Sequence, residues 1–351
     1  MRARGIADRA RRQRGVAVVT ALLLTTLAIT IVGSLFWQQQ VQVRSIENQR
    51  LQLQKQWILR GALDWARLIL REDGRLAGTV DTLNEPWAVP LAETRLDQYV
   101  EDSAAGSDAG DAILSGSVVD AQSRYNLRNL VANGQINPVE VAAFERLLAM
   151  LQVEPGLARA TATLMLESEP RTAQSATGSG TQGGSGAQTG AQTGAQGEPP
   201  GGIQGGEGTG SGGLLRMVYV DDLLAVPGFT PEALEKVRNF VIILPRPTTV
   251  NINTAPAEVL AARIDTLSLA EANALVTARQ TAAIRDLAYV GQMFPDKAGK
   301  LTKAELDGYL SVATRYFLVN GQVSMRRAGL EVQALIERDK TRTTLIWVKE
   351  N

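Results

Sequence analysis

The sequence of 351 residues contains no cysteine and no histidine. The lack of cysteine excludes a disulfide framework, thiolate metal sites and cysteine nucleophiles. The lack of histidine removes the commonest general base, and with it the Ser-His-Asp triad and the histidine-based zinc and iron sites. Any metal ion would therefore have to be bound by oxygen ligands.

Motifs for nucleotide binding are also missing, because no G-x-x-x-x-G-K-[ST] phosphate loop is present and no G-x-G-x-x-G opens a helix. A carboxylate-pair enzyme or a Ser-Lys hydrolase stays open, since 36 acidic residues form pairs at any spacing by chance. The 36 basic residues balance them, which argues against a surface built for nucleic acid or anionic lipid. The composition favours a protein that binds or builds something over an enzyme.

One long apolar run, residues 16–37, stands out. It contains no charge, Pro, Asn or Gln, and as a helix rising ~1.5 Å per residue it spans about 30 Å, the thickness of a bilayer's hydrocarbon core. The segment before it carries one acid, Asp8, and six arginines, which predicts a cytoplasmic N-terminus and a chain that crosses the membrane. These arginines are Arg2, Arg4, Arg9, Arg11, Arg12 and Arg14.

The basic segment joins the apolar run at Arg14-Gly15-Val16. The sequence FWQQ at residues 36–39 is a poor signal-peptidase site, and Gly15 does not fit a twin-arginine signal. Two interpretations remain on these residues alone. The run is an uncleaved single-pass anchor, or residues 1–15 are a prepilin-type leader cut between Gly15 and Val16, so that residues 16–37 begin a retained helix.

The helical pattern continues beyond the run. Ile58, Ala62, Trp65 and Ile69 recur on one helix face and predict an apolar stripe that packs on a soluble domain. We therefore expect one helix over residues 16–70, roughly 80 Å long, with a stop at Gly74.

The order of the later elements predicts an α+β protein. Residues 38–119 and 311–351 are expected to form one α/β domain, and residues 120–310 an inserted helical domain that contains a disordered Gly-, Ser- and Gln-rich loop at 173–213. Two tandem domains joined by that loop are the alternative. The expected strands are 113–120, 314–323, 327–338 and 343–349, and the expected helices are 138–151, 155–167, 231–241, 268–279, 301–309 and one that Thr254 caps.

Several segments, taken in chain order, resemble the minor pseudopilin K family of bacterial type II secretion, also called general secretion pathway protein K. The resemblance covers nearly the whole chain apart from the Gly-rich loop. The segments that carry it are RGV at 14–16, RGALDWAR at 60–67, DAQSRYNLRNL at 120–130, DLLAVPGFT at 222–230, VNINTA at 250–255 and RYFLV at 315–319.

The resemblance implies a pilin-like fold, in which a long N-terminal transmembrane helix packs on a small antiparallel sheet. It also implies an inner-membrane prepilin that prepilin peptidase cuts after Gly15 and N-methylates at Val16. The implied role is that of a minor pseudopilin at the tip of the periplasmic pseudopilus, which starts assembly, limits fibre length and does no chemistry. The implied partners are minor pseudopilins I, J and H, the major pseudopilin G, prepilin peptidase and the inner-membrane assembly platform.

Thr20 is the fifth residue after the expected cleavage point, where most pilin-like proteins have Glu. A charge at this depth costs on the order of 2.5–3.5 kcal/mol, so it is kept only where it has a partner. A subunit at the top of the fibre has no neighbour above it and needs no such charge. Thr20 therefore favours a tip position, and its hydroxyl is expected to bond to the carbonyl of Val16.

A membrane-anchored DNA-binding protein of a competence apparatus is the alternative function. The segment VNINTAPAEVL at residues 250–260 resembles the entry to a helix-hairpin-helix module. Such hairpins hold phosphate with backbone N–H groups and need glycines, and residues 261–270 contain none. The similarity is therefore interpreted as a shared helical scaffold.

No cofactor is required by the expected role, but the family resemblance suggests calcium as a structural ion in the soluble part. Asp221 and Asp222 are adjacent acids beside a turn and are the candidate ligands. A solvated pair near a helix start is the competing interpretation.

Overall fold

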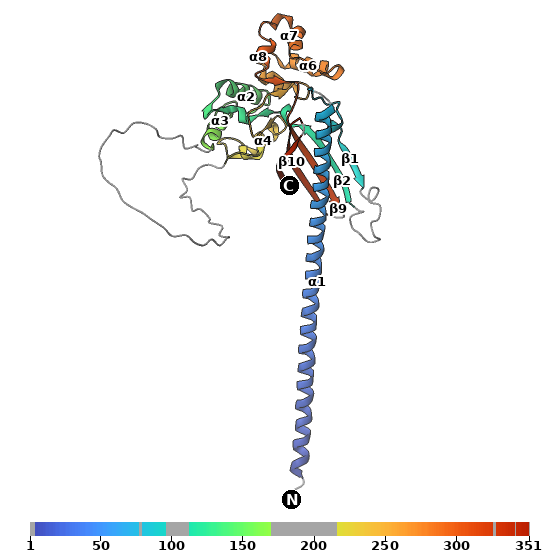
Figure 1. The fold of residues 1–351 in the computed structure, drawn as a ribbon. Helices are drawn as coiled ribbons and strands as arrows, with labels where there is room; N and C mark the ends of the chain where they lie inside the picture. The colour runs from blue at the N-terminus through green and yellow to red at the C-terminus, as the bar shows by residue number, and fades with distance from the viewer. Residues whose placement is uncertain are drawn as a thin grey trace, which may run out of the picture. The chain divides into compact units, whose positions relative to one another are not determined.

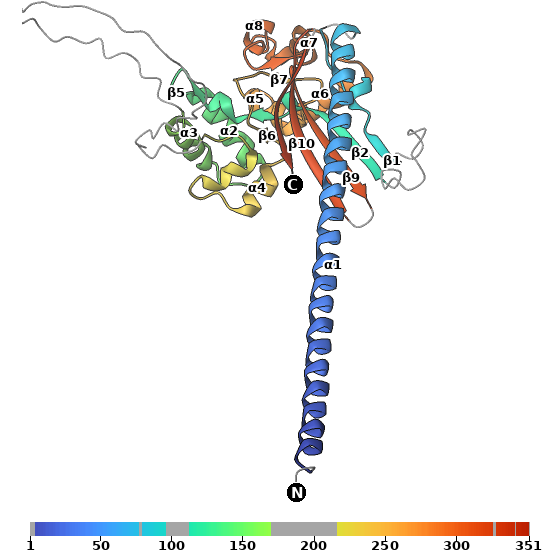
Figure 2. The ribbon, with the colours of Figure 1, turned by 60° about the horizontal axis from the view of Figure 1, so that its bottom comes forward.

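The computed structural model describes residues 4–76, 79–95, 112–169, 216–325, 328–340 and 342–350. The chain forms two compact units (Figures 1 and 2). The sheet unit comprises residues 1–78, 84–119 and 317–351, and the helical unit comprises residues 79–83 and 120–316. The predicted α+β fold class is confirmed. The expected loop at 173–213 lies outside the described residues.

A single helix, α1 (Arg4–Leu76), opens the sheet unit and is 73 residues long. It extends past both ends of the predicted helix, so the predicted stop at Gly74 is wrong. A Cβ atom at Gly74 would lie 3.2 Å from Cδ of Arg338. Gly74 therefore allows the close approach of this arginine and does not end the helix.

Five strands follow one another across the sheet in the order β1-β2-β9-β10-β11. β1 pairs antiparallel with β2, and β10 with β11. Gly116 in β2 is required because a Cβ there would lie 2.8 Å from the carbonyl oxygen of Asn320. The strands are β1 (Leu91–Arg95), β2 (Ala112–Asp120), β9 (Tyr316–Met325), β10 (Ala328–Arg338) and β11 (Thr343–Glu350). β1 is not among the predicted strands, and its five residues, LAETR, show no apolar alternation.

The later part of α1 packs on this sheet, as Figure 2 shows. Ala66 and Leu70 are buried against Phe317 and Ile336, and a short helix η1 (Pro86–Ala88) adds Trp87 to the same core. The predicted stripe is displaced by one residue, because Trp65 is 53% exposed. Two neighbouring faces of α1 are apolar in sequence, and only the sheet decides which of them is covered.

Short helices and two-residue strands build the helical unit around one large apolar core. Two strand pairs are parallel, β3 with β6 and β7 with β8, and β4 pairs antiparallel with β5. In chain order the elements up to the undescribed segment are η4 (Ala121–Ser123), β3 (Tyr125–Asn126), η5 (Leu127–Leu130), β4 (Val131–Ala132), β5 (Gln135–Ile136), α2 (Pro138–Met150) and α3 (Leu157–Glu167). The elements after it are η6 (Val220–Ala225), α4 (Pro231–Val237), β6 (Val241–Ile242), β7 (Val250–Asn251), α5 (Ala257–Arg263), α6 (Leu269–Thr281), α7 (Ala288–Met293), η7 (Pro295–Lys297), α8 (Lys303–Leu306) and β8 (Leu310–Ser311).

Two predicted helices of this unit are too long. The helix expected at 231–241 ends at Val237, and the one expected at 301–309 is reduced to α8. In both places the following residues leave the helix to pair as β6 and β8. Pairing of such short strands depends on residues far along the chain, so local periodicity cannot predict it.

Candidate functional site

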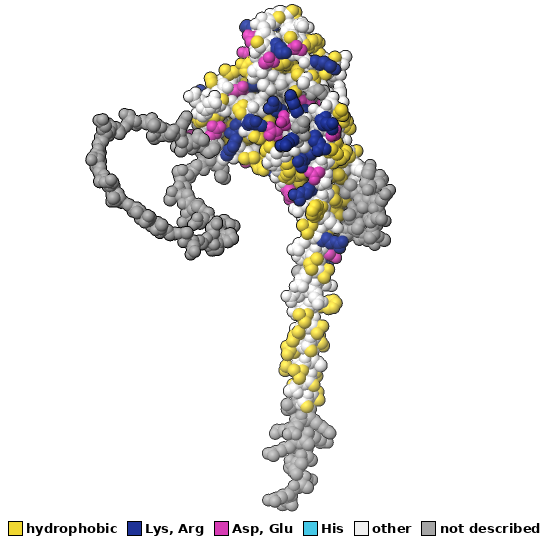
Figure 3. Space-filling view, viewed as in Figure 1, with side chains coloured by type: hydrophobic (Ala, Val, Ile, Leu, Met, Phe, Trp, Pro, Cys, Tyr) yellow, Lys and Arg dark blue, Asp and Glu magenta, His cyan; other side chains and the backbone are white. Residues whose placement is uncertain are grey.

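The first candidate site is the apolar part of α1. It is long and apolar enough to cross a membrane, and none of this window is buried inside the structure. Figure 3 shows hydrophobic side chains along this apolar part of α1, with no acidic or basic side chains among them. The hydroxyls of Thr20, Thr25, Thr26 and Thr30 all donate to carbonyl oxygens of the preceding turn, so they add no unsatisfied polar group to an apolar surrounding.

Thr20 donates to the carbonyl oxygen of Ala17 at 3.0 Å. The expected acceptor, the carbonyl of Val16, is therefore wrong by one residue, but the hydroxyl is satisfied within its own helix. Gly15 and Val16 both lie within α1, and the side chain of Val16 is not among those that the structure describes.

The second candidate site is polar and lies at the start of the helical unit. It is centred on Asp120, which is 1% exposed. Its Oδ1 accepts a hydrogen bond from the backbone N–H of Gln122 at 2.7 Å. Its Oδ2 accepts from Asn251 Nδ2 at 2.9 Å and from Thr254 Oγ1 at 2.5 Å. Thr254 was predicted to cap a helix, but its hydroxyl donates to this distant carboxylate instead. The next helix, α5, begins only at Ala257.

Burial dominates the electrostatics of this carboxylate. It raises the pKa of Asp120 from 3.8 to about 6, although the hydrogen bonds from Thr254, Asn251 and Gln122 act in the opposite direction. The two motifs singled out in the sequence, residues 120–130 and 250–255, thus meet in one buried cluster. Their shared role is to join two distant segments of the helical unit.

The helical unit also contains a buried ion pair, which joins Glu140 of α2 and Arg263 of α5. The Glu140 carboxylate also accepts from the hydroxyl of Tyr125 at 2.9 Å, and the guanidinium lies over the rings of Tyr125 and Tyr309 at 5.5 and 5.2 Å. Burial, and then the charge of Glu140, raise the pKa of Tyr125 well above its usual value. Sequence analysis missed this pair, because nothing local marks two residues that are 123 positions apart.

The same pair bears on the helix-hairpin-helix interpretation, which places phosphate contacts between α5 and α6. The connection at residues 264–268 contains no glycine. The side chain of Arg263, next to it, is 1% exposed and paired with Glu140, so it cannot reach a phosphate. This geometry does not favour a DNA-binding function.

Asp221 and Asp222 lie side by side in η6 but have different partners. Oδ1 of Asp221 is 3.0 Å from Nη2 of Arg238. Oδ2 of Asp222 accepts the backbone N–H groups of Val218 and Tyr219 at 2.7 and 2.9 Å. Calcium needs six to eight converging oxygen ligands, and these carboxylates instead face a guanidinium and two N–H donors. The residues present do not fit a calcium ion there, and the calcium expectation stays an untested prediction.

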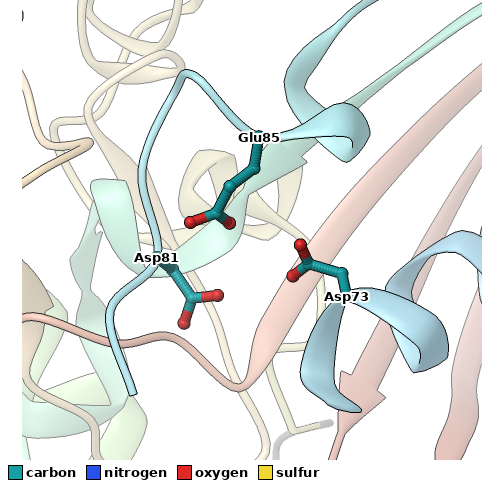
Figure 4. Close-up of side chains that lie close together, drawn as sticks. All are labelled: Asp73, Asp81 and Glu85. Atoms are coloured by element: carbon teal, nitrogen blue, oxygen red, sulfur yellow. The ribbon is translucent and has the colours of Figure 1, made fainter. Parts of the chain in front are cut away.

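Figure 4 shows three further carboxylates, Asp73 and Glu85 of the sheet unit and Asp81 of the helical unit. Asp73 pairs with Arg338 at 2.5 Å. Glu85 accepts from the Trp87 indole N–H, and Asp81 accepts from the backbone N–H of Thr314 at 2.7 Å. Each of the three therefore has a structural role within its own unit.

The sheet unit also carries an apolar groove with a volume of about 230 Å³. It lies between α1, the segment around η1 and strand β2. Leu59, Trp65, Trp87, Leu114 and Val319 are among the residues that line it. An apolar groove of this kind is typical of a surface that packs against another protein.

Comparison with known proteins gives a consistent family. The chain is 26% identical over 344 residues to type II secretion system protein K of Pseudomonas aeruginosa PAO1, an alignment that covers 94% of this chain and 90% of that protein. It is 24% identical over 337 residues to type II secretion system protein K of Aeromonas hydrophila, with 92% of each covered.

The fold is similar to that of a chain in the crystal structure of the GspK-GspI-GspJ complex from the type 2 secretion system of enterotoxigenic Escherichia coli. The TM-score is 0.60 at 19% identity, and the match covers 88% of this chain and 99% of that chain. Family models described as type II secretion system (T2SS), protein K match residues 123–246 and 250–312, which is more than half of the sequence. The chain belongs to the type II secretion system protein K family.

Proposed function

We propose that this chain is the minor pseudopilin at the tip of the type II secretion pseudopilus, where it initiates assembly and limits fibre length during export of folded proteins across the outer membrane. The observation that carries this proposal is α1 itself. Its apolar half suits first the bilayer and then the interior of a fibre of packed helices, while its later half is anchored on the sheet. The role is structural and involves no catalytic step.

Exposed apolar side chains beyond the membrane-length run support assembly through α1. Val43, Ile46, Leu53 and Trp57 are each more than half exposed. Such apolar side chains are unfavourable on a helix that is exposed to water, but neighbouring helices in a fibre would bury them. The proposed partners are minor pseudopilins I, J and H and the major pseudopilin G, and the solved structural neighbour is a GspK-GspI-GspJ complex.

Thr20 supports the tip position in particular. Its hydroxyl donates within α1 and it carries no charge, so it offers no carboxylate to the N-terminal ammonium of another subunit. We place the mature chain in the inner membrane before assembly, with its N-terminus cytoplasmic and its two units in the periplasm. Prepilin peptidase and the inner-membrane assembly platform are the proposed partners at that stage.

The prepilin assignment predicts a defined change in mass. Protein extracted from membranes should lack residues 1–15 and carry one methyl group on the amino group of Val16. Intact-mass spectrometry measures this, and the same protein from a host without prepilin peptidase should keep the full 351 residues. An uncleaved chain in the presence of the peptidase would contradict the prepilin assignment and would show that α1 is a plain membrane anchor.

The tip position predicts contacts on one side only. Because the chain contains no cysteine, a single cysteine introduced at Val43 or Ile46 on the exposed surface of α1 gives an unambiguous crosslink. Crosslinks to other pseudopilins should all come from subunits nearer the membrane. Partners found both above and below this chain would place it in the shaft and contradict the argument from Thr20.

A further inference from the structure

The apolar run of α1 ends in two aromatic side chains, Phe36 and Trp37. Both lie on the surface of the helix, where Phe36 is 64% and Trp37 is 73% exposed. The described chain therefore leaves most of each ring uncovered. A tryptophan in this position needs surroundings that suit both its apolar ring and its polar N–H group.

The indole of Trp37 combines a large apolar surface with one N–H group that can only donate a hydrogen bond. Trp87 of the sheet unit meets both requirements inside the protein, because it is 1% exposed and its N–H donates to a carboxylate oxygen of Glu85. Trp37 has no such core around it. The boundary of a bilayer meets both requirements, since the ring lies against acyl chains while the N–H donates to ester or phosphate oxygens.

Distance along α1 places Trp37 at such a boundary. At ~1.5 Å per residue it lies about 30 Å from Ala17, which matches the thickness of the hydrocarbon core. Trp57, the next tryptophan of α1, lies about 30 Å further along the helix, where the guanidinium of Arg60 is 6.0 Å from the centre of its ring. When the apolar run spans a bilayer, Trp37 is therefore at its edge and Trp57 is well outside it.

The residues that follow the run are polar but uncharged. Residues 36–43, FWQQQVQV, contain no Lys, Arg, Asp or Glu, and the first charge is Arg44, about 10 Å beyond Trp37. The amide groups of the three glutamines at 38–40 can both donate to and accept from lipid headgroups. Anionic lipid is attracted by clusters of Lys and Arg next to the membrane, which this end of the run lacks. Its chemistry therefore fits a headgroup layer without net charge.

We infer that Trp37, with Phe36 and the amides of residues 38–40, is a binding site for the ester and headgroup layer of zwitterionic phospholipid on the periplasmic side, and that it sets how deeply α1 lies in the bilayer. The length of an apolar run alone permits several depths and tilts, and interfacial aromatic side chains select among them. The inference rests on the proposed placement of α1 in the inner membrane and adds the residues that fix the helix there.

Quenching of tryptophan fluorescence by brominated lipid tests this site on the full chain, alone in phosphatidylcholine vesicles. Bromine near the glycerol end of the acyl chains should quench at least about 2-fold more than bromine near the methyl end, and Trp37→Phe should remove most of this quenching. Trp57→Phe is the matched control, because Trp57 is 68% exposed on the same helix, and it should leave the quenching nearly unchanged.

Flotation of the same vesicles shows separately whether the chain inserts. A chain that does not float would contradict the proposed membrane placement and this inference with it. A chain that floats, but whose quenching is stronger from bromine near the methyl end, or is reduced equally by Trp37→Phe and Trp57→Phe, would overturn the assignment of Trp37 alone. Adding phosphatidylglycerol should change the ratio of quenching at the two bromine positions by less than about 1.5-fold, and a ratio that requires this anionic lipid would overturn the zwitterionic class.

A displaced tryptophan tests whether the indole sets the depth of α1. In Trp37→Gln/Gln40→Trp the indole moves three residues, about 4.5 Å, along the helix. Because the chain has no cysteine, an environment-sensitive fluorophore can be attached at Val43→Cys, an exposed position. In the displaced variant the fluorophore should enter the interface, with brighter and blue-shifted emission. Emission that is the same in both proteins would show that the indole does not set the depth.

Discussion

Replacing Arg263 with methionine is expected to lower the free energy of unfolding of the helical unit by about 3–5 kcal/mol, because it leaves the buried carboxylate of Glu140 without its cation. The guanidinium is 1% exposed, so water cannot take its place. The substitution also removes the stacked positions over Tyr125 and Tyr309. Thermal or denaturant unfolding of the full chain in detergent micelles measures the loss.

A double-mutant cycle separates the ion pair from simple packing. Glu140→Gln in the Arg263→Met background removes the uncompensated charge and should restore a substantial part of the stability. Arg263→Lys keeps the charge but loses the planar fork and the ring contacts, so it should be intermediate. Arg159→Gln on an exposed face should stay within about 0.5 kcal/mol of wild type. Losses from Arg263→Met and Glu140→Gln that simply add would show that the two side chains do not act as a pair.

The difference between what the sequence predicts and what it cannot predict is visible in this ion pair. The apolar run, the long helix and the later alternating strands are local patterns, and the structure has all three. The pairing of Glu140 with Arg263 depends on two helices from distant parts of the chain. No periodicity marks such a pair, because each residue alone resembles an ordinary charge on a helix.

The polar motifs show a similar limit. Asn and Thr are residue types that commonly cap helices, and Asn126 does cap η5 by accepting the N–H of Arg128. The hydroxyl of Thr254 instead donates a hydrogen bond to the carboxylate of Asp120, 134 positions earlier in the chain. A hydroxyl next to a predicted helix start resembles a cap in sequence, and only tertiary contact reveals the stronger acceptor.

The calcium prediction assumed that two neighbouring residues act together, and it stays a prediction. Asp221 and Asp222 are adjacent in sequence, but the turn of η6 directs one to Arg238 and the other to the backbone before the helix. In a tight helix, successive side chains point in different directions. The hydrogen bonds of Gln122, Asn126 and Asn129 to residues 246–249 were not predicted, because their backbone partners carry no sequence signal of their own.

Asp120→Asn is expected to change the pH dependence of the stability of the helical unit between pH 4 and pH 7. The folded pKa of Asp120 is about 6 against an ordinary value of 3.8. The folded protein therefore holds this proton more tightly than the unfolded chain between these two values. The stability from Asp120 is fully present below pH ~4 and is lost as the pH rises through about 6. The loss is on the order of 3 kcal/mol, since each pKa unit corresponds to about 1.4 kcal/mol.

Unfolding free energies of wild type and Asp120→Asn, measured in parallel from pH 4 to pH 7, isolate this contribution, because all other groups titrate alike in both proteins. The advantage of wild type over the variant should shrink by roughly 2–3 kcal/mol across that range. Asp296→Asn, at an exposed position of η7, is the control and should give a small, constant difference. An advantage that grows as the pH rises would show the opposite balance. In that case the hydrogen bonds from Thr254, Asn251 and Gln122 would outweigh burial, and the cluster would hold Asp120 as an ionised carboxylate.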